Sequence, residues 1–295
     1  MDSSSLYRLF ALSAIWGASF LFVKIGAPVL GPVFLIFFRV LFAAAFLLLV
    51  AFVMKREMNL IRHWKHFLMF GFFGTALPFM LFAYAANTIS ASLLSILNAT
   101  SPIWAAGLSA AWTRKPLSPK SLLGLGLGLG GVALLAGVES MHLPSGGFLA
   151  ILSGLAAAFS YGLATVYANH AEAVDPFSNA VGSVLGALVI MTPLLFLAQG
   201  PSTLPAPHVM FAVFALGVVC SGVAFLLYFR LVADVGPAPA LTVTFLIPVF
   251  GILWGVIFLG ESVGWHTLVG SAIVLAGTAL VTGFSFKALA LRFAQ

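Results

Sequence analysis

Residues 33–53 read VFLIFFRVLFAAAFLLLVAFV, and Arg39 is the one charged side chain among them. An apolar run of about 20 residues is what an α-helix needs to cross the hydrocarbon core of a bilayer. The run is continuous and does not alternate between apolar and polar residues, so it does not fit a strand of a membrane barrel. It predicts a transmembrane helix.

The rest of the chain has the same character. Of its 295 residues, 62% are hydrophobic and 7% are charged, whereas soluble globular chains carry about 25% charged residues. The mean hydropathy is +1.16. Because so few charges cannot cover a surface that faces water, we expect the lipid bilayer to surround the protein. The predicted fold class is an all-α polytopic membrane protein without a sizeable aqueous domain.

Apolar runs bounded by glycine, proline and charged residues predict ten transmembrane helices. They lie at 7–27, 33–53, 64–87, 89–112, 119–138, 147–169, 177–198, 207–233, 236–259 and 265–286. No small-residue cleavage site follows the first run, so we expect it to stay in the protein as a helix and not to act as a signal peptide.

The basic residues lie almost entirely on one side of this topology. Eleven of the 13 fall on segments that share a side with the N-terminus: Arg8, Lys55, Arg56, Arg62, Lys65, Arg114, Lys115, Lys120, Arg230, Lys287 and Arg292. The loops assigned to the other side, 28–32, 139–146, 199–206 and 260–264, contain no Lys or Arg. The positive-inside rule therefore predicts cytoplasmic N- and C-termini. We interpret the net charge of +6 as a topology signal and expect no nucleic-acid partner.

The chain also repeats itself. Trp16-Gly17 in the first run corresponds to Tyr161-Gly162 in the sixth, at an offset of 145 residues. At an offset of 146, further pairs correspond: Thr75 and Ser221, Pro102 and Pro248, Trp112 and Phe258, Gly124 and Gly270, Gly131 and Gly277. Since each half holds five spans, an odd number, the second half must be inverted relative to the first. We predict two five-helix repeats, 1–140 and 141–295.

Several of these motifs together resemble the EamA-type drug/metabolite transporter superfamily. They are Trp-Gly-Ala-Ser-Phe from Trp16 with Lys24, then Arg39, Ser101-Pro102, the glycine-rich fifth run, Thr244–Pro248, Leu259-Gly260-Glu261 and Gly270 to Gly277. The resemblance covers nearly the whole chain. It implies a carrier in the bacterial inner (plasma) membrane that exports small metabolites, with amino-acid and metabolite exporters as the most similar members.

Two prolines occupy matched places in the fourth and ninth runs. Pro102 and Pro248 each remove one helical hydrogen bond and would free the carbonyls of Asn98 and Thr244. We predict helix breaks there, with the freed carbonyls lining a substrate site near the membrane midplane. The alternative is a packing kink whose carbonyl is repaired by a hydroxyl group.

The other candidate binding residues are polar or aromatic. Ser95, Asn98 and Pro102 form one polar stripe by their spacing, which faces either a substrate or a neighbouring helix. Aromatic residues of four spans could form a wall for flat or apolar groups, or could fill the lipid-facing surface: Trp16, Tyr84, Tyr161 and Tyr228.

Lys24 and Arg39 are the basic residues outside the cytoplasmic set. Arg39 lies about 10 Å inside the predicted membrane and is a candidate for binding a substrate carboxylate, the alternative being a structural role. Lys24 is shallower, and we expect it to extend to the outer headgroups.

Carboxylates and histidines are predicted in loops or at span ends, so no group near the midplane titrates as a proton-coupled antiporter requires. The chain departs in this from the small multidrug-resistance branch, which relies on a glutamate in its first span. We predict a facilitator of amino acids with apolar or aromatic side chains, working by alternating access. A proton-coupled drug or nucleoside exporter is the alternative within this class, and an open channel is a further one.

The motifs of an intramembrane enzyme are missing from the sequence, and we expect no catalysis, cofactor or metal. The single cysteine, Cys220, is interpreted as a small core residue. The run of Gly124, Gly126, Gly128, Gly130 and Gly131 lies inside an apolar span, so it predicts close packing against the tenth span and not a dinucleotide loop. With this packed scaffold a monomer is plausible.

Overall fold

The computed structural model describes residues 3–140, 146–201 and 204–283. Within these ranges the regular structure is entirely helical, and the predicted all-α fold class is confirmed. The predicted positions of Lys287 and Arg292, and of the last residues of the tenth span, lie outside the described residues.

The helices follow the predicted apolar runs. In chain order they are α1 (Ser3–Val53), α2 (Trp64–Gly71), η1 (Phe72–Ala76), α3 (Leu77–Ala85), α4 (Ala91–Asn98), α5 (Ser101–Thr113), α6 (Pro119–Ser140), α7 (Gly147–His170), α8 (Pro176–Leu195), α9 (Pro207–Gly217), η2 (Val218–Val223), α10 (Ala224–Val235), α11 (Pro237–Ala240), α12 (Val243–Leu259) and α13 (Trp265–Thr282). Across the described ranges, eight helical stretches are long and apolar enough to cross a membrane, and the shorter apolar α12 accompanies them. The protein is therefore polytopic.

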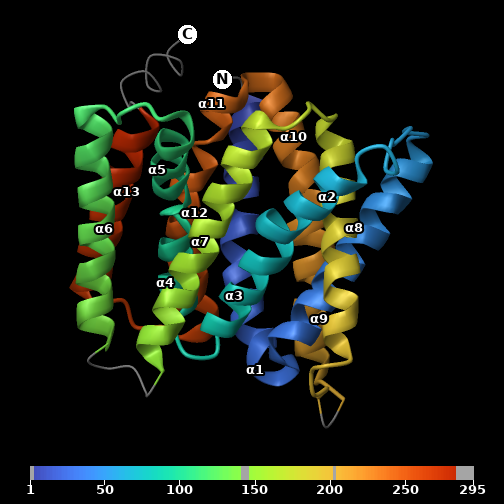
Figure 1. Cartoon of the computed structure of the whole chain (residues 1–295). Coiled ribbons are helices and arrows are strands. Elements are labelled where there is room, and N and C mark those ends of the chain that lie inside the picture. The colour runs from blue at the N-terminus through green and yellow to red at the C-terminus, as the bar shows by residue number, and fades with distance from the viewer. Residues whose placement is uncertain (1–2, 141–145, 202–203, 284–295) are drawn as a thin grey trace.

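α1 contains both of the first two predicted spans. At Gly31 the backbone leaves the helical conformation (φ 70°, ψ 161°), and Pro28 and Pro32 stand on either side of this residue. Glycine enters the positive-φ region at little cost, and proline interrupts the helical hydrogen bonds. Figure 1 shows that the two segments of α1 run in opposite directions from this point, and a side chain at Gly26 would touch Leu35. α1 is thus a hairpin of two helical segments.

The third and eighth predicted spans each contain a π-helical segment, which the sequence patterns did not predict. η1 joins α2 to α3, and η2 joins α9 to α10. They begin at Phe72 and Val218, which is the same 146-residue offset that relates Thr75 to Ser221. A π-turn adds one residue to a helical turn and is frequent at functional sites. It shifts the side chains that follow it to a different face of the helix.

The fourth and ninth predicted spans are interrupted, but not at equivalent residues. α4 ends at Asn98 and α5 begins at Ser101, so the first interruption lies directly before Pro102. The second lies between α11 and α12, well before Pro248, and α12 continues through that proline. The break expected at Pro248 is therefore displaced toward the N-terminus, where α11 (PAPA) carries two prolines of its own.

The glycine-rich fifth and tenth spans pack against each other, as predicted. A Cβ at Gly124 would lie 2.6 Å from the carbonyl oxygen of Gly277, and one at Gly277 would lie 2.6 Å from the nitrogen of Gly128. Such an approach is possible only without side chains. In Figure 1 the pair α6 and α13 stands together at one edge of the bundle.

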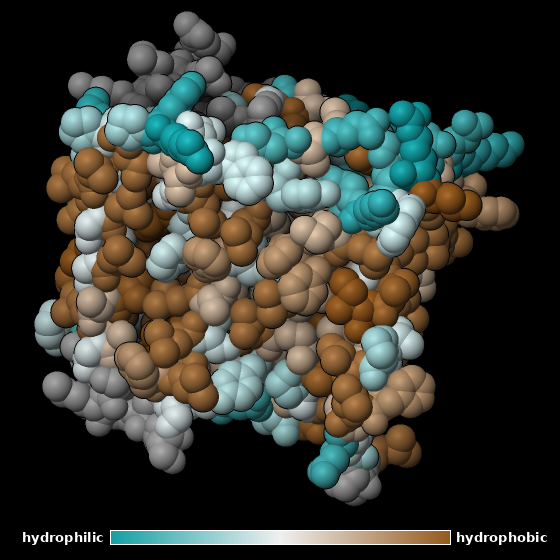
Figure 2. All heavy atoms as spheres, in the orientation of Figure 1, coloured by the Kyte–Doolittle hydropathy of each residue, from teal (hydrophilic) through white to brown (hydrophobic). Residues whose placement is uncertain are grey.

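The surface has the polarity of a membrane protein. Figure 2 shows apolar residues over the middle of the face in view and hydrophilic residues along its upper edge, where α1 begins. Large apolar side chains project outward, among them Phe52 (81% exposed), Phe211 and Val189. Because these side chains would be costly in water, they fit contact with lipid tails.

Candidate functional site

The two halves of the chain meet along their first helices. α1 packs against α8, α9 and α12 of the second half, and α7 packs against α3 and α5 of the first. α4 contacts both α7 and α12. The junction of the halves therefore contains the predicted candidate residues of α1, α4, α7 and α12.

Two matched glycines allow the closest approaches at this junction. A Cβ at Gly17 would lie 2.7 Å from the Cβ of Phe250, and one at Gly162 would lie 2.9 Å from the Cβ of Trp104. Each glycine thus brings the first helix of one half onto the interrupted span of the other half. The aromatic residue that precedes each glycine is carried to the junction with it.

Three of the four predicted aromatic residues lie at this junction. The ring of Trp16 lies 5.5 Å from that of Tyr228, which belongs to the other half. The ring of Tyr161 lies 6.3 Å from that of Phe82, again across the halves. Tyr84 is 46% exposed on α3 and is not brought to this group. Phe82 was not predicted, because nothing in its apolar surroundings distinguishes it from the other phenylalanines.

Ser95 is fully buried in a packing position. Its hydroxyl donates to the carbonyl of Ser92 (2.7 Å), and a Cβ at Gly251 would clash with its side chain. The residue therefore sits against the backbone of α12. This geometry corresponds to the contact with a neighbouring helix that was the alternative to substrate binding.

The carbonyls freed by the first interruption are satisfied by hydroxyl groups. The Asn98 carbonyl accepts a hydrogen bond from the Ser101 hydroxyl (2.6 Å), and the Ala99 carbonyl accepts one from Thr278 (2.9 Å). This is the repaired kink named as the alternative above. The side chain of Asn98 is half-buried, and no group in the described part of the chain hydrogen-bonds its amide.

At the second interruption the polar groups are less completely paired. Thr244 is half-buried in the first turn of α12, and its N–H donates to the carbonyl of Leu241 (3.0 Å). The hydroxyl of the neighbouring Thr242 is buried without a hydrogen-bond partner among the described residues. An unpaired buried hydroxyl is costly, so Thr242 is a candidate for binding a polar group.

Arg39 is buried (6% exposed) and directed at the junction. Its Nε donates to the hydroxyl of Ser221 (3.1 Å), and its guanidinium carbon lies 3.4 Å from the ring centre of Phe79. Ser221 and Phe79 were missed by sequence reasoning. The correspondence of Ser221 with Thr75 was the one signal that pointed to this position.

The end of the bundle opposite the N-terminus is held by two charged residues. Lys24 donates to the carbonyls of Ala86 (2.7 Å) and Ile89 (2.9 Å), so its side chain bends onto the loop before α4. The expectation that it extends to the outer headgroups is therefore wrong. Glu261 accepts hydrogen bonds from two backbone N–H groups of the first turn of α4 (2.6 and 3.0 Å) and from the Ser92 hydroxyl (2.6 Å). Glu261 therefore links the second half to the first.

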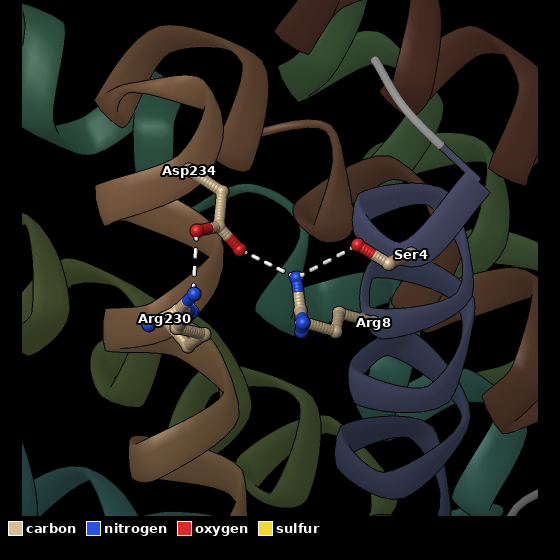
Figure 3. A network of polar contacts seen from close by, with 4 residues as sticks. All are labelled: Ser4, Arg8, Arg230 and Asp234. Atoms are coloured by element: carbon tan, nitrogen blue, oxygen red, sulfur yellow. Dashed lines mark hydrogen bonds and ion pairs between the residues drawn. The ribbon is translucent and has the colours of Figure 1, made fainter.

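At the other end, an ionic network joins α1 to α10 (Figure 3). Arg8 donates to Asp234 (2.5 Å) and to Ser4 (3.2 Å), and Arg230 contacts the second oxygen of Asp234 (3.2 Å). Figure 3 shows Arg8 reaching from its helix toward the carboxylate between the two arginines. Contacts between the halves thus exist at both ends of the candidate site.

No group of three or more His, Cys, Asp or Glu side chains that could hold a metal ion is found within the described ranges. Cys220 is buried as expected and lies 3.3 Å from the carbonyl of Ile15.

Known proteins share both the sequence pattern and the fold. The EamA-like transporter family matches residues 4–137 and again residues 148–283. Similar chains include the uncharacterized transporter YoaV of Bacillus subtilis (21% identical, covering 95% of this chain and 96% of the relative) and an uncharacterized transporter of Archaeoglobus fulgidus (26%, 95% and 98%). The uncharacterized inner membrane transporter YedA of Escherichia coli is 25% identical over 93% of this chain and 89% of its own. One crystal structure has a similar fold, with a TM-score of 0.64 and 20% sequence identity. The alignment covers 100% of this chain and 100% of the chain in that structure.

Proposed function

The chain belongs to the EamA-like transporter family, and from this premise we propose that this multi-pass inner-membrane transporter exports small amphipathic metabolites by alternating access. Amino acids with apolar or aromatic side chains are the leading substrates. The protein works as a facilitator, without catalysis, and its site opens alternately to the two sides as the halves rock against each other.

The topology that we propose has ten passes. The two segments of α1 count as separate passes, and α11 with α12 forms one further pass. Residues 1–140 and 141–295 then form inverted repeats, with both termini in the cytoplasm. Two observations support this arrangement. η1 and η2 begin at the same offset that relates the other matched motifs, and Gly17 and Gly162 each bring the first helix of one half close to a span of the other half.

The observation that carries the proposal is the aromatic contact between the halves. Trp16 of one half faces Tyr228 of the other at 5.5 Å, so a rocking motion of the halves would change the distance between these rings. An apolar or aromatic side chain of a substrate can pack between rings of this kind, and the tyrosine hydroxyl can orient its polar end. Thr244 and Asn98 supply further hydrogen-bonding groups near the interrupted spans.

Transport without proton coupling is supported by the buried polar groups. Within the described residues, the buried polar side chains comprise serines, threonines and Arg39, with no Asp, Glu or His among them. A proton-coupled drug or nucleoside exporter, the rival proposal, needs a titrating group that both sides can reach in turn. Export that stops when the pH gradient is collapsed would support that rival.

The proposal is tested with purified protein in liposomes and a panel of labelled amino acids, nucleosides and cationic drugs. We expect saturable counterflow of amphipathic compounds, whereas an open channel gives flux that does not saturate. Trp16→Ala should raise the half-saturating concentration about tenfold or more, because it removes a wall of the site. Trp112→Ala is the matched control, since Trp112 is 67% exposed, and should leave transport unchanged. Equal behaviour of both variants would contradict the site.

A further inference from the structure

Arg39 carries a charge deep within the membrane-spanning part of the protein. It follows the turn at Gly31 by eight residues, which is about 12 Å along a helix, and α1 continues for another 14 residues to Val53. The side chain is 6% exposed, so neither water nor lipid headgroups surround it. A charge at this depth is costly unless something compensates it.

The groups around Arg39 are neutral. Ser221 accepts a hydrogen bond from Nε, and the ring of Phe79 lies under the guanidinium. The cation–π contact and one neutral hydrogen bond compensate only part of a buried charge.

The five carboxylates whose side chains the structure describes are engaged elsewhere or are exposed. Asp234 pairs with Arg8 and Arg230, Glu172 pairs with Arg62, Asp175 caps α8, Glu261 caps α4 and Glu57 is exposed. Arg39 makes no ion pair with any of them. None of these five carboxylates is therefore the counter-ion of this buried cation, and its charge is open to an anionic group of a ligand.

The π-helix η2 prepares Ser221 as an acceptor. Its hydroxyl proton is directed to the carbonyl of Leu216, five residues earlier (3.1 Å), so the oxygen lone pairs remain for Nε of Arg39. With Nε held by Ser221 and the guanidinium carbon held over the Phe79 ring, the position of the fork of terminal amino groups is restricted. This fork has the geometry that binds a carboxylate with two parallel hydrogen bonds.

The arrangement exists in one half only. The residue that corresponds to Arg39 at an offset of 146 is Leu185, so Thr75, the counterpart of Ser221, has no arginine at the position that corresponds to Arg39. The charge is therefore not required by the repeated fold itself. Such an asymmetry is expected of a specificity element.

We propose that Arg39, positioned by Ser221 and Phe79, is the carboxylate anchor of this carrier, and that its substrates are small amphipathic molecules that bear a carboxylate. The inference rests on the transport function proposed above and narrows it. Organic cations are rejected by the unpaired positive charge, and uncharged nucleosides cannot supply the missing counter-ion. Ser221 is a positioning residue, because it acts through the arginine.

The test compares ligands that share a phenyl ring but differ in charge. The thermal midpoint of the purified full-length protein is measured with 3-phenylpropionate, L-phenylalanine, phenethylamine and uridine, and counterflow of the same compounds is measured in liposomes. We expect the two carboxylates to raise the midpoint and to exchange, and phenethylamine and uridine to do neither. This comparison uses the unmodified protein, so it does not depend on a variant that folds.

Variants then assign the effect to the anchor. Arg39→Gln should abolish carboxylate binding, and Arg39→Lys should weaken it at least tenfold, because an ammonium keeps the charge but loses the fork. Ser221→Ala should weaken binding about threefold to tenfold, whereas Thr75→Ala, which removes the corresponding hydroxyl from η1, should leave it unchanged.

The two levels of the proposal fail differently. Phenethylamine or uridine bound as well as the carboxylates, no carboxylate binding at all, or carboxylate binding that survives Arg39→Gln would overturn the anchor. If carboxylates bind through Arg39 but nothing crosses the membrane, the anchor stands and the transport function is wrong.

Discussion

Glu261 is the residue that most directly ties one half of the chain to the other at the end opposite the N-terminus. The first N–H groups of any helix lack partners within the helix, and a carboxylate at that position also interacts favourably with the helix dipole. Ser90 satisfies one such group of α4, the N–H of Leu93 (3.1 Å), and Glu261 satisfies two more. A side chain from the loop after α12 therefore completes the cap of a helix in the first half.

Removing this cap should destabilise the protein. Glu261→Ala leaves two N–H groups and the Ser92 hydroxyl without their acceptor, and we expect a loss of about 1–3 kcal/mol in the free energy of unfolding. Glu261→Gln, which keeps one acceptor oxygen, should lose less. Thermal unfolding in detergent measures both.

Glu172→Ala provides the control for this prediction. Glu172 is 64% exposed and pairs with Arg62 at the surface, so its removal should change stability by no more than about 0.5 kcal/mol. A larger loss from Glu172→Ala than from Glu261→Ala would show that the contacts of Glu261 are not a stabilising cap.

At the scale of helices, α6 and α13 show how small residues determine packing in a membrane. Lipid tails are as apolar as the helices, so association depends on close contact and not on the hydrophobic effect. Glycines on the facing surfaces let the two backbones touch, while other glycines of the same run face open space. The run therefore contains glycines that are needed for helix packing and glycines at which a side chain would meet no neighbour.

These two kinds of position allow a matched test. Gly277→Val would place a side chain 2.6 Å from the backbone of Gly124 and Gly128, so we expect the helices to separate and stability to fall by about 1–3 kcal/mol or more. A Cβ at Gly130 would meet no atom within 4 Å, so Gly130→Val should be nearly neutral. Thermal unfolding distinguishes the two, and equal midpoints would contradict the packing.

At the scale of the whole molecule, the Arg8–Asp234 pair joins the halves at the end where α1 begins. Its side chains are 26% and 21% exposed, compared with 71% and 64% for the surface pair of Arg62 and Glu172. A partly buried ion pair is screened less by solvent, so its two charges should be energetically coupled.

A double-mutant cycle measures this coupling. Arg8→Ala, Asp234→Ala and the double variant should give an interaction of about 1 kcal/mol in the free energy of unfolding. The same cycle on Arg62 and Glu172 should give a value near zero. No coupling for Arg8 and Asp234 would mean that the network in Figure 3 does not hold the halves together.

The proposed orientation is tested by labelling. Because Cys220 is the single cysteine, Cys220→Ala provides a background for new ones. In intact cells, Leu204→Cys should react with a membrane-impermeant maleimide, and Arg56→Cys should react only after permeabilisation. Both positions are exposed, so access depends on the side of the membrane. The reverse pattern would contradict cytoplasmic termini.

Much of the fold could be predicted from the sequence because lipid imposes its constraint segment by segment. Each crossing needs about 20 apolar residues with its backbone groups paired inside the helix, so the limits of α7, α8 and α13 lie within a few residues of the predicted runs. The glycine contacts of α6 and the depth of Arg39 follow from the same local information. The π-segments do not, because their residues have no distinctive pattern.

The candidate site depends on contacts between residues far apart in the chain. The length of each apolar run, the charge of each loop and the repeated motifs are properties of short segments. They determined by themselves that this is a polytopic helical protein of two related halves. Only the tertiary structure decided that Ser221 meets Arg39, that Ser101 repairs the carbonyl of Asn98 and that Tyr84 stays outside the group. The physical reason is that a side chain gains a distant partner only when another helix packs on its face. Which face is packed depends on the rotation of each helix about its axis, and hydropathy does not encode that rotation.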